Sequence, residues 1–337
     1  MLSLDKADLK NKKVLVRVDF NVMPFTPREP RIINSLETIR FLMRKKARVI
    51  LITHLETNEG KIPSALKLAK WMRERYFRKL IFVPDLIGDK AEAAVSRVKP
   101  GEILMLENLR IDPREKACKI VFAKRLASFA DIYINEAFAA SHRNHASIVL
   151  LPKFLPSYFG FRYEQEINVL SQAFKPPHPL VLILGGGKVD TKLPLLKAML
   201  PKIDKALLGG VIANKFLEKP IIKSPKIILP IDVVRVGDKI WDDGPETFKE
   251  WKKIINKAKL VIWNGPLGFV ENGYVKGTKT LVLILAKTRA RVIIGGGDTT
   301  DYLPKKLPKN IFVSTGGGAM LEFLVKKTLP GIEAIKH

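Results

Sequence analysis

Apolar, strand-like segments that end in glycine constrain the fold of this chain more than any other feature. Four such segments lie in the second half, and eighteen of the 22 glycines follow residue 160. The segments are 180–184 before Gly185-Gly186-Gly187, 206–208 before Gly209-Gly210, 291–294 before Gly295-Gly296-Gly297, and 311–315 before Gly316-Gly317-Gly318. Glycine lets the backbone take positive φ and approach a ligand, and a following helix points unpaired N–H groups at it. The second half therefore predicts a surface suited to phosphates.

Strand-like segments of the first half end differently, in charged and polar side chains. The segments 14–18, 49–52, 103–106 and 132–134 lead into residues that include Asp19, Asn21, His54, Arg110 and Glu136. In an open α/β sheet, ligands bind beyond the carboxyl ends of the strands. Two exit surfaces of such different character predict two different ligands.

The strand-like segments alternate with amphipathic segments of helical periodicity, which predicts βαβ units and parallel sheets. The expected helices span 35–45, 64–76, 122–129, 192–200, 245–258 and 276–287. A further helix over 162–174 ends at the proline-rich stretch 175–179, which cannot continue it. With 337 residues, the prediction is an α/β chain of two Rossmann-like domains, each a parallel β-sheet with helices on both faces, joined by a hinge helix.

The net charge of +26 favours polyanionic ligands without identifying one. It divides equally, because residues 1–160 and 161–337 each carry +13, so no basic tail predicts a dedicated nucleic-acid partner. Weak, non-specific RNA binding is the expected side effect. The single Cys118 excludes a disulfide framework, and no apolar run is long enough to cross a bilayer. We expect a cytoplasmic monomer without a membrane partner.

The glycine-rich motifs of the second half differ from the common nucleotide fingerprints. Neither a Walker A sequence nor a GxGxxG is present, but Lys188 and Lys192 lie four residues apart at the start of a helix after Gly187. The pair suits a polyphosphate, or forms a solvated helix face. Asp298, beside Thr299, either holds Mg²⁺ on nucleotide phosphates or caps the next helix. Asn264 and Glu271 supply polar groups for a ribose, or belong to an ordinary loop.

Cationic side chains crowd the expected strand exits and loops of the first half. They are Arg17, Arg31, His54, Arg110, His142, Arg143 and His145. A lone arginine is usually a surface charge, but several at the exits of one sheet suit phosphate and carboxylate groups. Asp19 and Asn21 either cap the turn after their strand or bind hydroxyls of a small polar substrate.

Taken in order, these segments resemble phosphoglycerate kinase along nearly the whole chain. Eight collinear segments carry the resemblance: VLVRVDFNV at 14–22, LENLR at 106–110, NEAF at 135–138, HRNHAS at 142–147, GGGKV at 185–189, WNGP at 263–266, GGGDT at 295–299 and STGGGA at 314–319. The family transfers a phosphoryl group reversibly between 1,3-bisphosphoglycerate with ADP and 3-phosphoglycerate with ATP. The resemblance implies this glycolytic reaction, with Mg²⁺ as cofactor and hinge closure between two domains.

The resemblance also implies a role for particular residues. Residues 1–160 are expected to bind phosphoglycerate, with a tail at about 325–337 packing back on them, and residues 161–324, including the helix at about 162–175, to bind the nucleotide. The substrate-binding residues implied by matching motifs are Asp19, Asn21, Arg31, His54, Arg110 and Arg143. Those implied for the nucleotide are Lys188, Lys192, Gly209, Gly210, Asn264, Glu271, Gly295, Gly296, Gly297, Asp298 and Thr299, with Asp298 on the metal. The implied catalytic groups are Arg31, Lys188, Lys192, Gly316, Gly317 and Gly318.

The chain also departs from the family pattern. The family continues His-Leu-Gly-Arg-Pro where this chain reads His54-Leu55-Glu56-Thr57-Asn58, so one expected arginine is absent and Lys61 is a candidate replacement. The segment 216–229, on the adenine side of the implied pocket, is short. Two other function classes stay open: an inactive relative that binds RNA, and a kinase for another acyl phosphate.

Overall fold

The structure, a computed structural model, describes residues 3–22, 25, 29–57, 59–300, 302–304 and 306–336, apart from the side chains of Asp298 and Lys336. By contacts within the chain, it divides into two compact units. Unit 1 comprises Met1–Ile167 with Thr328–His337, and unit 2 comprises Asn168–Lys327. Helix α6 (Phe161–Leu170) runs across the boundary, and a 3-10 turn at Ser171–Ala173 follows it.

Unit 1 is built on a six-stranded sheet in the order β3-β4-β2-β1-β5-β6, and every pair of neighbours is parallel. The strands are β1 (Lys13–Arg17), β2 (Arg48–Ile52), β3 (Ile81–Phe82), β4 (Ile103–Met105), β5 (Ile132–Asn135) and β6 (Ser157–Phe159). The helices are α1 (Pro30–Arg44), α2 (Leu66–Arg75), α3 (Asp89–Arg97), α4 (Pro113–Lys116), α5 (Ile120–Ala127) and the C-terminal α13 (Pro330–Lys336). In α13, the Gly331 N–H donates to the Ser141 carbonyl.

Alternation along β1 explains how helices cover both faces of this sheet. Val14 and Val16 face a core that includes Ile39 of α1, whereas Leu15 faces the opposite core, which includes Phe122 of α5. All of these side chains are fully buried. Strands buried on both faces need continuous apolar sequence, and β1 and β2 have it.

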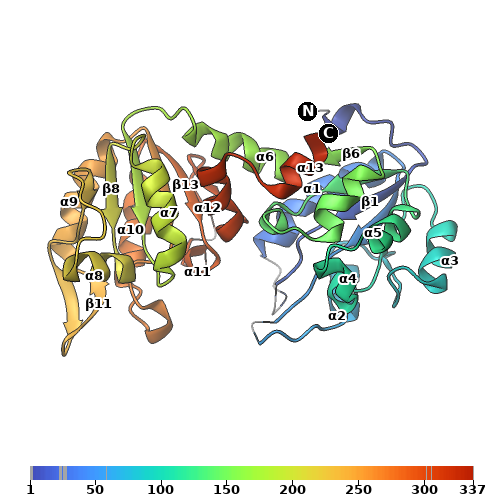
Figure 1. Cartoon of the computed structure of the whole chain (residues 1–337), viewed down its shortest axis with the longest axis horizontal. Helices are drawn as coiled ribbons and strands as arrows, with labels where there is room; N and C mark the ends of the chain where they lie inside the picture. Colours follow the sequence, from blue (N-terminus) through green and yellow to red (C-terminus); the bar gives the residue numbers. More distant parts are fainter. Residues whose placement is uncertain are drawn as a thin grey trace. The chain divides into compact units, whose positions relative to one another are not determined.

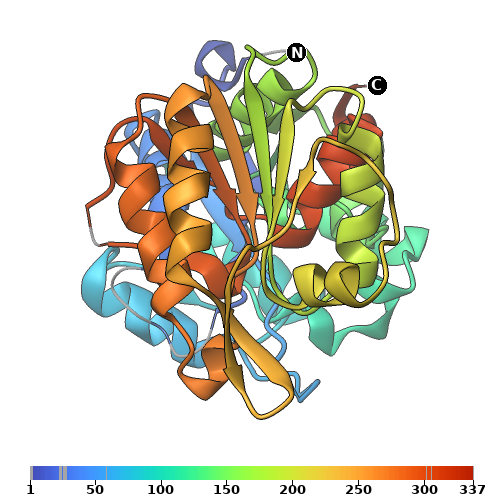
Figure 2. The same cartoon turned by 90° about the vertical axis from the view of Figure 1, so that its left-hand side faces the viewer.

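Unit 2 repeats the plan with a parallel sheet in the order β14-β13-β12-β7-β8-β9. Its strands are β7 (Leu180–Leu184), β8 (Lys205–Leu208), β9 (Ile227–Ile228), β12 (Leu260–Asn264), β13 (Arg291–Gly295) and β14 (Ile311–Val313), and a separate antiparallel hairpin pairs β10 (Val233–Val236) with β11 (Lys239–Asp243). The helices are α7 (Val189–Met199), α8 (Gly210–Glu218), α9 (Pro245–Lys257), α10 (Lys276–Lys287), α11 (Gly297–Thr300) and α12 (Gly317–Lys326). Figure 2 shows this unit with helices on either side of its sheet.

The predicted fold class is confirmed: the chain is α/β, with two parallel-sheet domains. Predicted helix bounds differ most at α1, which begins at Pro30 rather than residue 35, because proline occupies the first turn and the Glu29 side chain accepts the Arg31 N–H. The hairpin β10–β11 was not predicted. Val236 and most of its other side chains are exposed or half-buried, so the apolar signal of a core strand is weak there.

Candidate functional site

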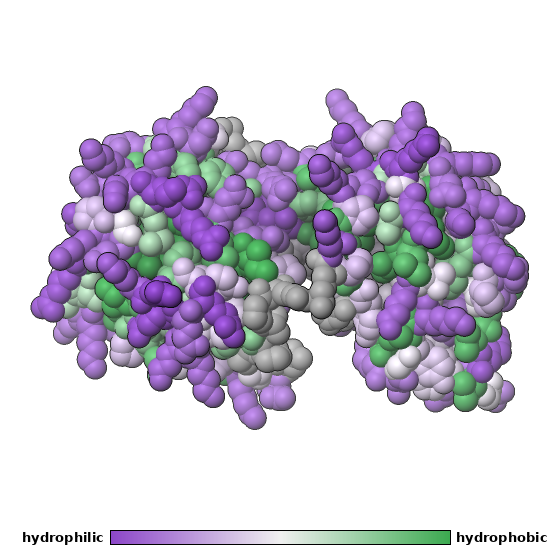
Figure 3. All heavy atoms as spheres, turned by 180° about the vertical axis from the view of Figure 1, so that it is seen from behind, coloured by the Kyte–Doolittle hydropathy of each residue, from purple (hydrophilic) through white to green (hydrophobic). Residues whose placement is uncertain are grey.

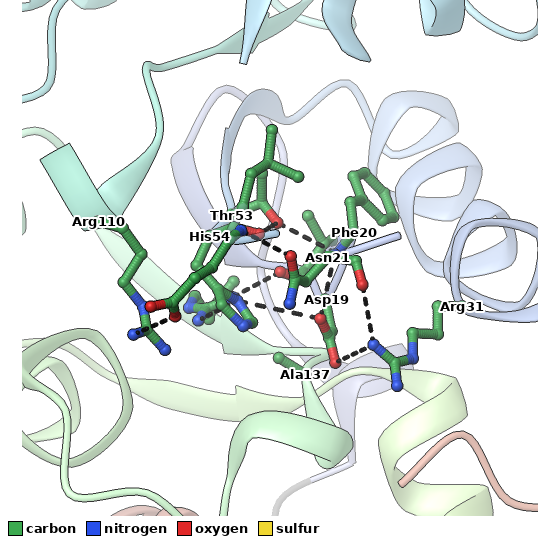
Figure 4. Close-up of polar contacts among 12 residues, drawn as sticks. Asp19, Phe20, Asn21, Arg31, Thr53, His54, Arg110 and Ala137 are labelled. Atoms are coloured by element: carbon green, nitrogen blue, oxygen red, sulfur yellow. Dashed lines mark hydrogen bonds and ion pairs between the residues drawn. The ribbon is translucent and has the colours of Figure 1, made fainter. Parts of the chain in front are cut away.

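The polar residues predicted at the strand exits of unit 1 gather on one edge of its sheet. Strands β4, β2 and β1 are parallel neighbours, so the residues that follow them meet at their carboxyl ends. Figure 4 shows Asp19, Asn21 and His54 close together, with Arg31 on one side and Arg110 on the other. Residues far apart in sequence therefore form one charged surface.

Asp19 and Asn21 anchor the Arg31 side chain, which projects from α1. Arg31 Nη1 donates to the Asn21 carbonyl at 3.1 Å and lies 3.7 Å from Asp19 Oδ2. Burial raises the pKa of the Asp19 carboxyl, but electrostatic attraction to Arg31, His54 and Arg17, together with the hydrogen bond from the Asn21 N–H, outweighs it, so the pKa lies below its ordinary value. The Arg31 side chain keeps 29% of its surface exposed. Arg31 therefore presents a positive charge that a ligand is able to reach.

His54 is neutral, and its tautomer follows from its partner. Arg17 Nη2 lies 3.1 Å from His54 Nδ1, and because arginine only donates, Nδ1 accepts and Nε2 carries the proton. Burial and the Arg17 charge hold the pKa of His54 well below its ordinary range. His54 is thus a rigid N–H donor rather than a general base.

Arg110 pairs with a residue that the sequence did not single out as functional. Its Nη1 lies 2.9 Å from Glu56 Oε2, and Lys116 Nζ lies 2.7 Å from Glu56 Oε1. Thr57, which stands where the family has an arginine, carries no charge. Lys61, the candidate replacement, is exposed, and its Nζ lies 3.8 Å from Glu59 Oε2. Lys116 is therefore the second cation that the Glu56 carboxylate contacts.

Arg143, in the loop after β5, adds a further cation near Arg110 and His54, and His145 lies in the same loop. Burial and the charges of Arg110 and Arg143 lower the pKa of His145 to about 4. Burial is the largest cause of this shift, and the neighbouring positive charges add to it. An anionic ligand would offset those charges.

Behind this surface, Glu115 had no recognisable sequence signal, whereas its partners Arg17 and Ser147 lie in the segments 14–22 and 142–147 that carry the family resemblance. Glu115 accepts from the Ser147 N–H at 2.8 Å and from its hydroxyl at 2.5 Å, and Arg17 Nε donates to Ser147 Oγ at 3.0 Å. Burial raises the pKa of the Glu115 carboxyl. Because Arg17 is fully buried and held by these partners, it orients His54 rather than meeting solvent.

In unit 2, the glycine turns lie at the carboxyl ends of adjacent strands, as predicted for a phosphate surface. Gly186 follows β7, Gly265 follows β12 and Gly296 follows β13, and all three have positive φ, at +77°, +92° and +109°. Helices α7, α11 and α12 start directly after glycine turns. Their first N–H groups therefore point toward the same edge of the sheet.

Lys192 is the buried cation of this edge. Its Nζ donates to Asn264 Oδ1 at 2.5 Å and to the Asn264 carbonyl at 3.1 Å, and the residue is 6% exposed. Lys188, at the N-cap of α7, is exposed instead. The two lysines, four residues apart in sequence, therefore occupy different environments.

The other predicted nucleotide residues lie around the same strand exits. Gly209 and Gly210 follow β8 at the start of α8, and Glu271 is exposed in the 3-10 turn Val270–Asn272. The Thr299 hydroxyl and Asn264 Nδ2 are buried without a hydrogen-bond partner among the described residues. The Asp298 side chain, the predicted metal ligand, lies outside the described part of the structure.

A cavity of about 660 Å³ in unit 2 was not predicted from sequence. It lies between α8 and the hairpin β10–β11, and its wall includes Leu217, Ile240, Trp241 and Phe269. Trp241 stacks on Tyr274 with ring centroids 5.0 Å apart. Charged side chains, among them Lys215, Glu218 and Arg235, also line the cavity, and its aromatic wall suits a flat organic group.

Two kinds of site were not found in the described part of the chain. No three His, Cys, Asp or Glu side chains there gather as a metal cluster. None of its helices combines the length and the apolar character that crossing a membrane requires. On the face drawn in Figure 3, hydrophilic side chains dominate the surface of both units.

A sequence model of phosphoglycerate kinase matches residues 4–224 and 219–327. The chain belongs to the phosphoglycerate kinase family. The phosphoglycerate kinase of Coprothermobacter proteolyticus is 38% identical over 98% of this chain and 97% of its own length, and that of Pseudothermotoga lettingae is 36% identical over 99% and 98%.

Solved structures agree with this assignment. The crystal structure of phosphoglycerate kinase from Pyrococcus horikoshii matches with a TM-score of 0.89 and 27% identity, covering 100% of this chain and 98% of that one. The Coxiella burnetii enzyme matches with a TM-score of 0.80 and 31% identity over 99% and 98%. The predicted family and reaction are confirmed: the family comprises glycolytic kinases, phosphotransferases of class EC 2.7.2.3.

Proposed function

We propose that this chain catalyses reversible phosphoryl transfer between 1,3-bisphosphoglycerate with ADP and 3-phosphoglycerate with ATP, and that the strand-exit surface of unit 1 binds the phosphoglycerate and that of unit 2 the nucleotide. The observation that carries the proposal is the different chemical character of these two surfaces. Unit 1 offers the cations Arg31 and Arg110 at its strand exits, and unit 2 offers glycine turns around the buried Lys192. Membership of the family supplies the reaction, and the residue roles below are inferred.

The phosphoglycerate site comprises Asp19, Asn21, Arg31, His54, Arg110 and Arg143. Arginine forks suit the phosphate and the carboxylate of this substrate, because each offers paired N–H donors to paired oxygens. The neutral His54 offers one N–H from Nε2, and Asp19 and Asn21 suit the substrate hydroxyl. Since Arg31 retains exposed surface and is tethered to Asn21, we infer that it reaches toward the reacting carboxylate.

The nucleotide site comprises Lys188, Lys192, Gly209, Gly210, Asn264, Glu271, Gly295, Gly296, Gly297, Asp298 and Thr299. The nucleotide phosphates would accept hydrogen bonds from the backbone N–H groups at the helix starts after the glycine turns. The transferring phosphoryl group would accept them from the N–H groups of Gly316, Gly317 and Gly318. The cavity beside Trp241 suits the flat adenine base of the nucleotide. The exposed Glu271 precedes Asn272, which lines this cavity, and its carboxylate would accept hydrogen bonds from the ribose hydroxyls.

Mg²⁺ suits this half of the site by its chemistry: the carboxylate of Asp298 is an oxygen ligand of the kind that Mg²⁺ prefers, and nucleotide phosphates would supply others. Thr299, the next residue in the sequence, has a buried hydroxyl without a partner among the described residues. The bound ion would neutralise charge on the nucleotide phosphates.

The reaction requires positioning rather than proton transfer. A carboxylate oxygen of 3-phosphoglycerate attacks the terminal phosphorus of ATP, the bond from that phosphorus to the bridging oxygen breaks, and ADP leaves. No general base is needed, since the attacking carboxylate is already ionised. Arg31, Lys188 and Lys192 would stabilise the equatorial oxygens once hinge closure unites the two surfaces.

A coupled assay with ATP and 3-phosphoglycerate tests the proposal, and turnover that depends on both substrates and Mg²⁺ is expected. Acetate and carbamate should not replace 3-phosphoglycerate; equal turnover with either would favour a kinase for another acyl phosphate. RNA binding, measured across salt concentrations, should be weak and abolished at high salt. No turnover with salt-resistant RNA binding would refute the proposal. We further propose that the protein is a cytoplasmic monomer. Sedimentation analysis would measure its oligomeric state.

A further inference from the structure

Glu56 is the acidic side chain that both Arg110 and Lys116 contact. Its two carboxylate oxygens are divided between them, with Oε2 2.9 Å from Arg110 Nη1 and Oε1 2.7 Å from Lys116 Nζ. The two cations come from separate elements, the 3-10 turn Leu109–Ile111 and helix α4. A single anionic group therefore bridges two cations at the strand exits.

The main chain at Glu56 is fixed, whereas its side chain is able to move. The Glu56 N–H donates to Asn21 Oδ1 at 2.8 Å, which ties the backbone to the loop after β1. The Glu56 side chain is 25% exposed. Rotation about its side-chain torsions would carry the carboxylate into solvent without disturbing this backbone contact.

Arg110 has unused hydrogen-bonding capacity beneath that carboxylate. Its side chain is only 3% exposed, and its Nε and Nη2 are buried without hydrogen-bond partners among the described residues. A guanidinium carries five N–H donors, and leaving them unpaired in a buried position costs free energy. A group with more acceptor oxygens than a carboxylate would satisfy Arg110 better. A phosphate has three such oxygens.

We propose that the Glu56 carboxylate occupies the place of the substrate's phosphate beside Arg110, and that 3-phosphoglycerate binds by displacing it. Glu56 is then a specificity-determining residue. An anion must outcompete an internal carboxylate, so a phosphate dianion gains entry more readily than a ligand that offers a carboxylate alone. Lys116 would pair with the Glu56 carboxylate before the substrate binds and with the substrate's phosphate afterwards. The inference rests on the proposed function, because it assigns Arg110 to that substrate.

Removing the competitor gives the proposal its test. Glu56→Gln keeps the size of the side chain and removes its charge. We expect isothermal titration calorimetry on the full chain to give a Kd for 3-phosphoglycerate about tenfold lower than in the wild type, the scale of one surrendered charge-assisted hydrogen bond. Inorganic phosphate should also inhibit the Glu56→Gln variant more strongly than it inhibits the wild type. Thermal melting of each variant checks that it is folded.

Glu59→Gln is the matched control, because it makes the same charge change on the same loop. Glu59 is exposed and lies 3.8 Å from Lys61. The Kd of the Glu59→Gln variant for 3-phosphoglycerate is expected to stay within about twofold of the wild-type value, because exposed ion pairs contribute little free energy.

An equal or weaker affinity in Glu56→Gln would overturn the inference, as would an equal gain in both variants, which would indicate only a general effect of charge. If neither the wild type nor the variants bind 3-phosphoglycerate, the proposed function itself fails. The two failures are therefore distinguishable.

Discussion

Replacing Gly265 by alanine would test whether the glycine turns of unit 2 are required by close packing. Gly265 follows β12 with φ at +92°. A Cβ added there would lie 2.4 Å from the Gly185 carbonyl oxygen and 2.5 Å from Lys192 Nζ. Because β12 and β7 are hydrogen-bonded neighbours, the Gly185 backbone is unable to move aside easily. We expect the substitution to separate the two turns and displace Lys192.

The cost of Gly265→Ala has two parts. A non-glycine residue at positive φ costs about 1–2 kcal/mol, and forcing a methyl against fixed backbone costs about 1–3 kcal/mol. The free energy of unfolding should therefore fall by roughly 2–5 kcal/mol. Gly273 separates the parts, because its φ is +84° but an added Cβ would meet nothing within 4 Å. Gly273→Ala should lose only about 1–2 kcal/mol.

Urea unfolding followed by tryptophan fluorescence measures both variants. Trp241, Trp251 and Trp263 lie in unit 2, so the signal reports mainly on the unit that carries the substitution. Affinity for ATP should fall in Gly265→Ala, since Lys192 would be displaced. Equal losses of stability in the two variants would refute the reasoning, because the close approach of Gly185 would then cost nothing.

The remaining predictions concern the charged residues. Arg31→Ala should lower kcat by a factor on the order of a thousand, as for other arginines that stabilise a transferring phosphoryl group; a loss of only a few-fold in steady-state kinetics would remove Arg31 from that role. Asn264→Ala should raise the KM for ATP about tenfold, because Lys192 loses one of its two Asn264 acceptors; an unchanged KM would show that Asn264 does not position it. The pKa of His145, about 4 against an ordinary 6.5, means that the folded chain binds fewer protons than the unfolded chain between these values. Stability should therefore be lost as pH falls from 6.5 to 4, and urea unfolding should show a smaller loss in His145→Asn; identical pH profiles would contradict the prediction.

The strand exits were largely predictable from sequence because each depends on a local pattern. Buried parallel strands need uninterrupted apolar residues, and the glycine or polar residue after each strand marks its end, so β7 and α10 have the predicted bounds. Contacts between distant segments have no such signal. Nothing near Glu56 in the sequence indicates that it pairs with Lys116, 60 positions away. The cavity beside Trp241 was missed for the same reason, since α8 and the hairpin form it together.

The sequence by itself determined the α/β class, the two kinds of strand exit and the family, because periodicity and ordered motifs are properties of the chain alone. Only the tertiary structure decided how individual charges are used. It buries Arg17 against Ser147 and His54, holds Lys192 on Asn264 and covers Arg110 with Glu56. Burial and the distance to an opposite charge control what an ionisable side chain does, and both depend on parallel strands that bring remote segments to one edge of a sheet.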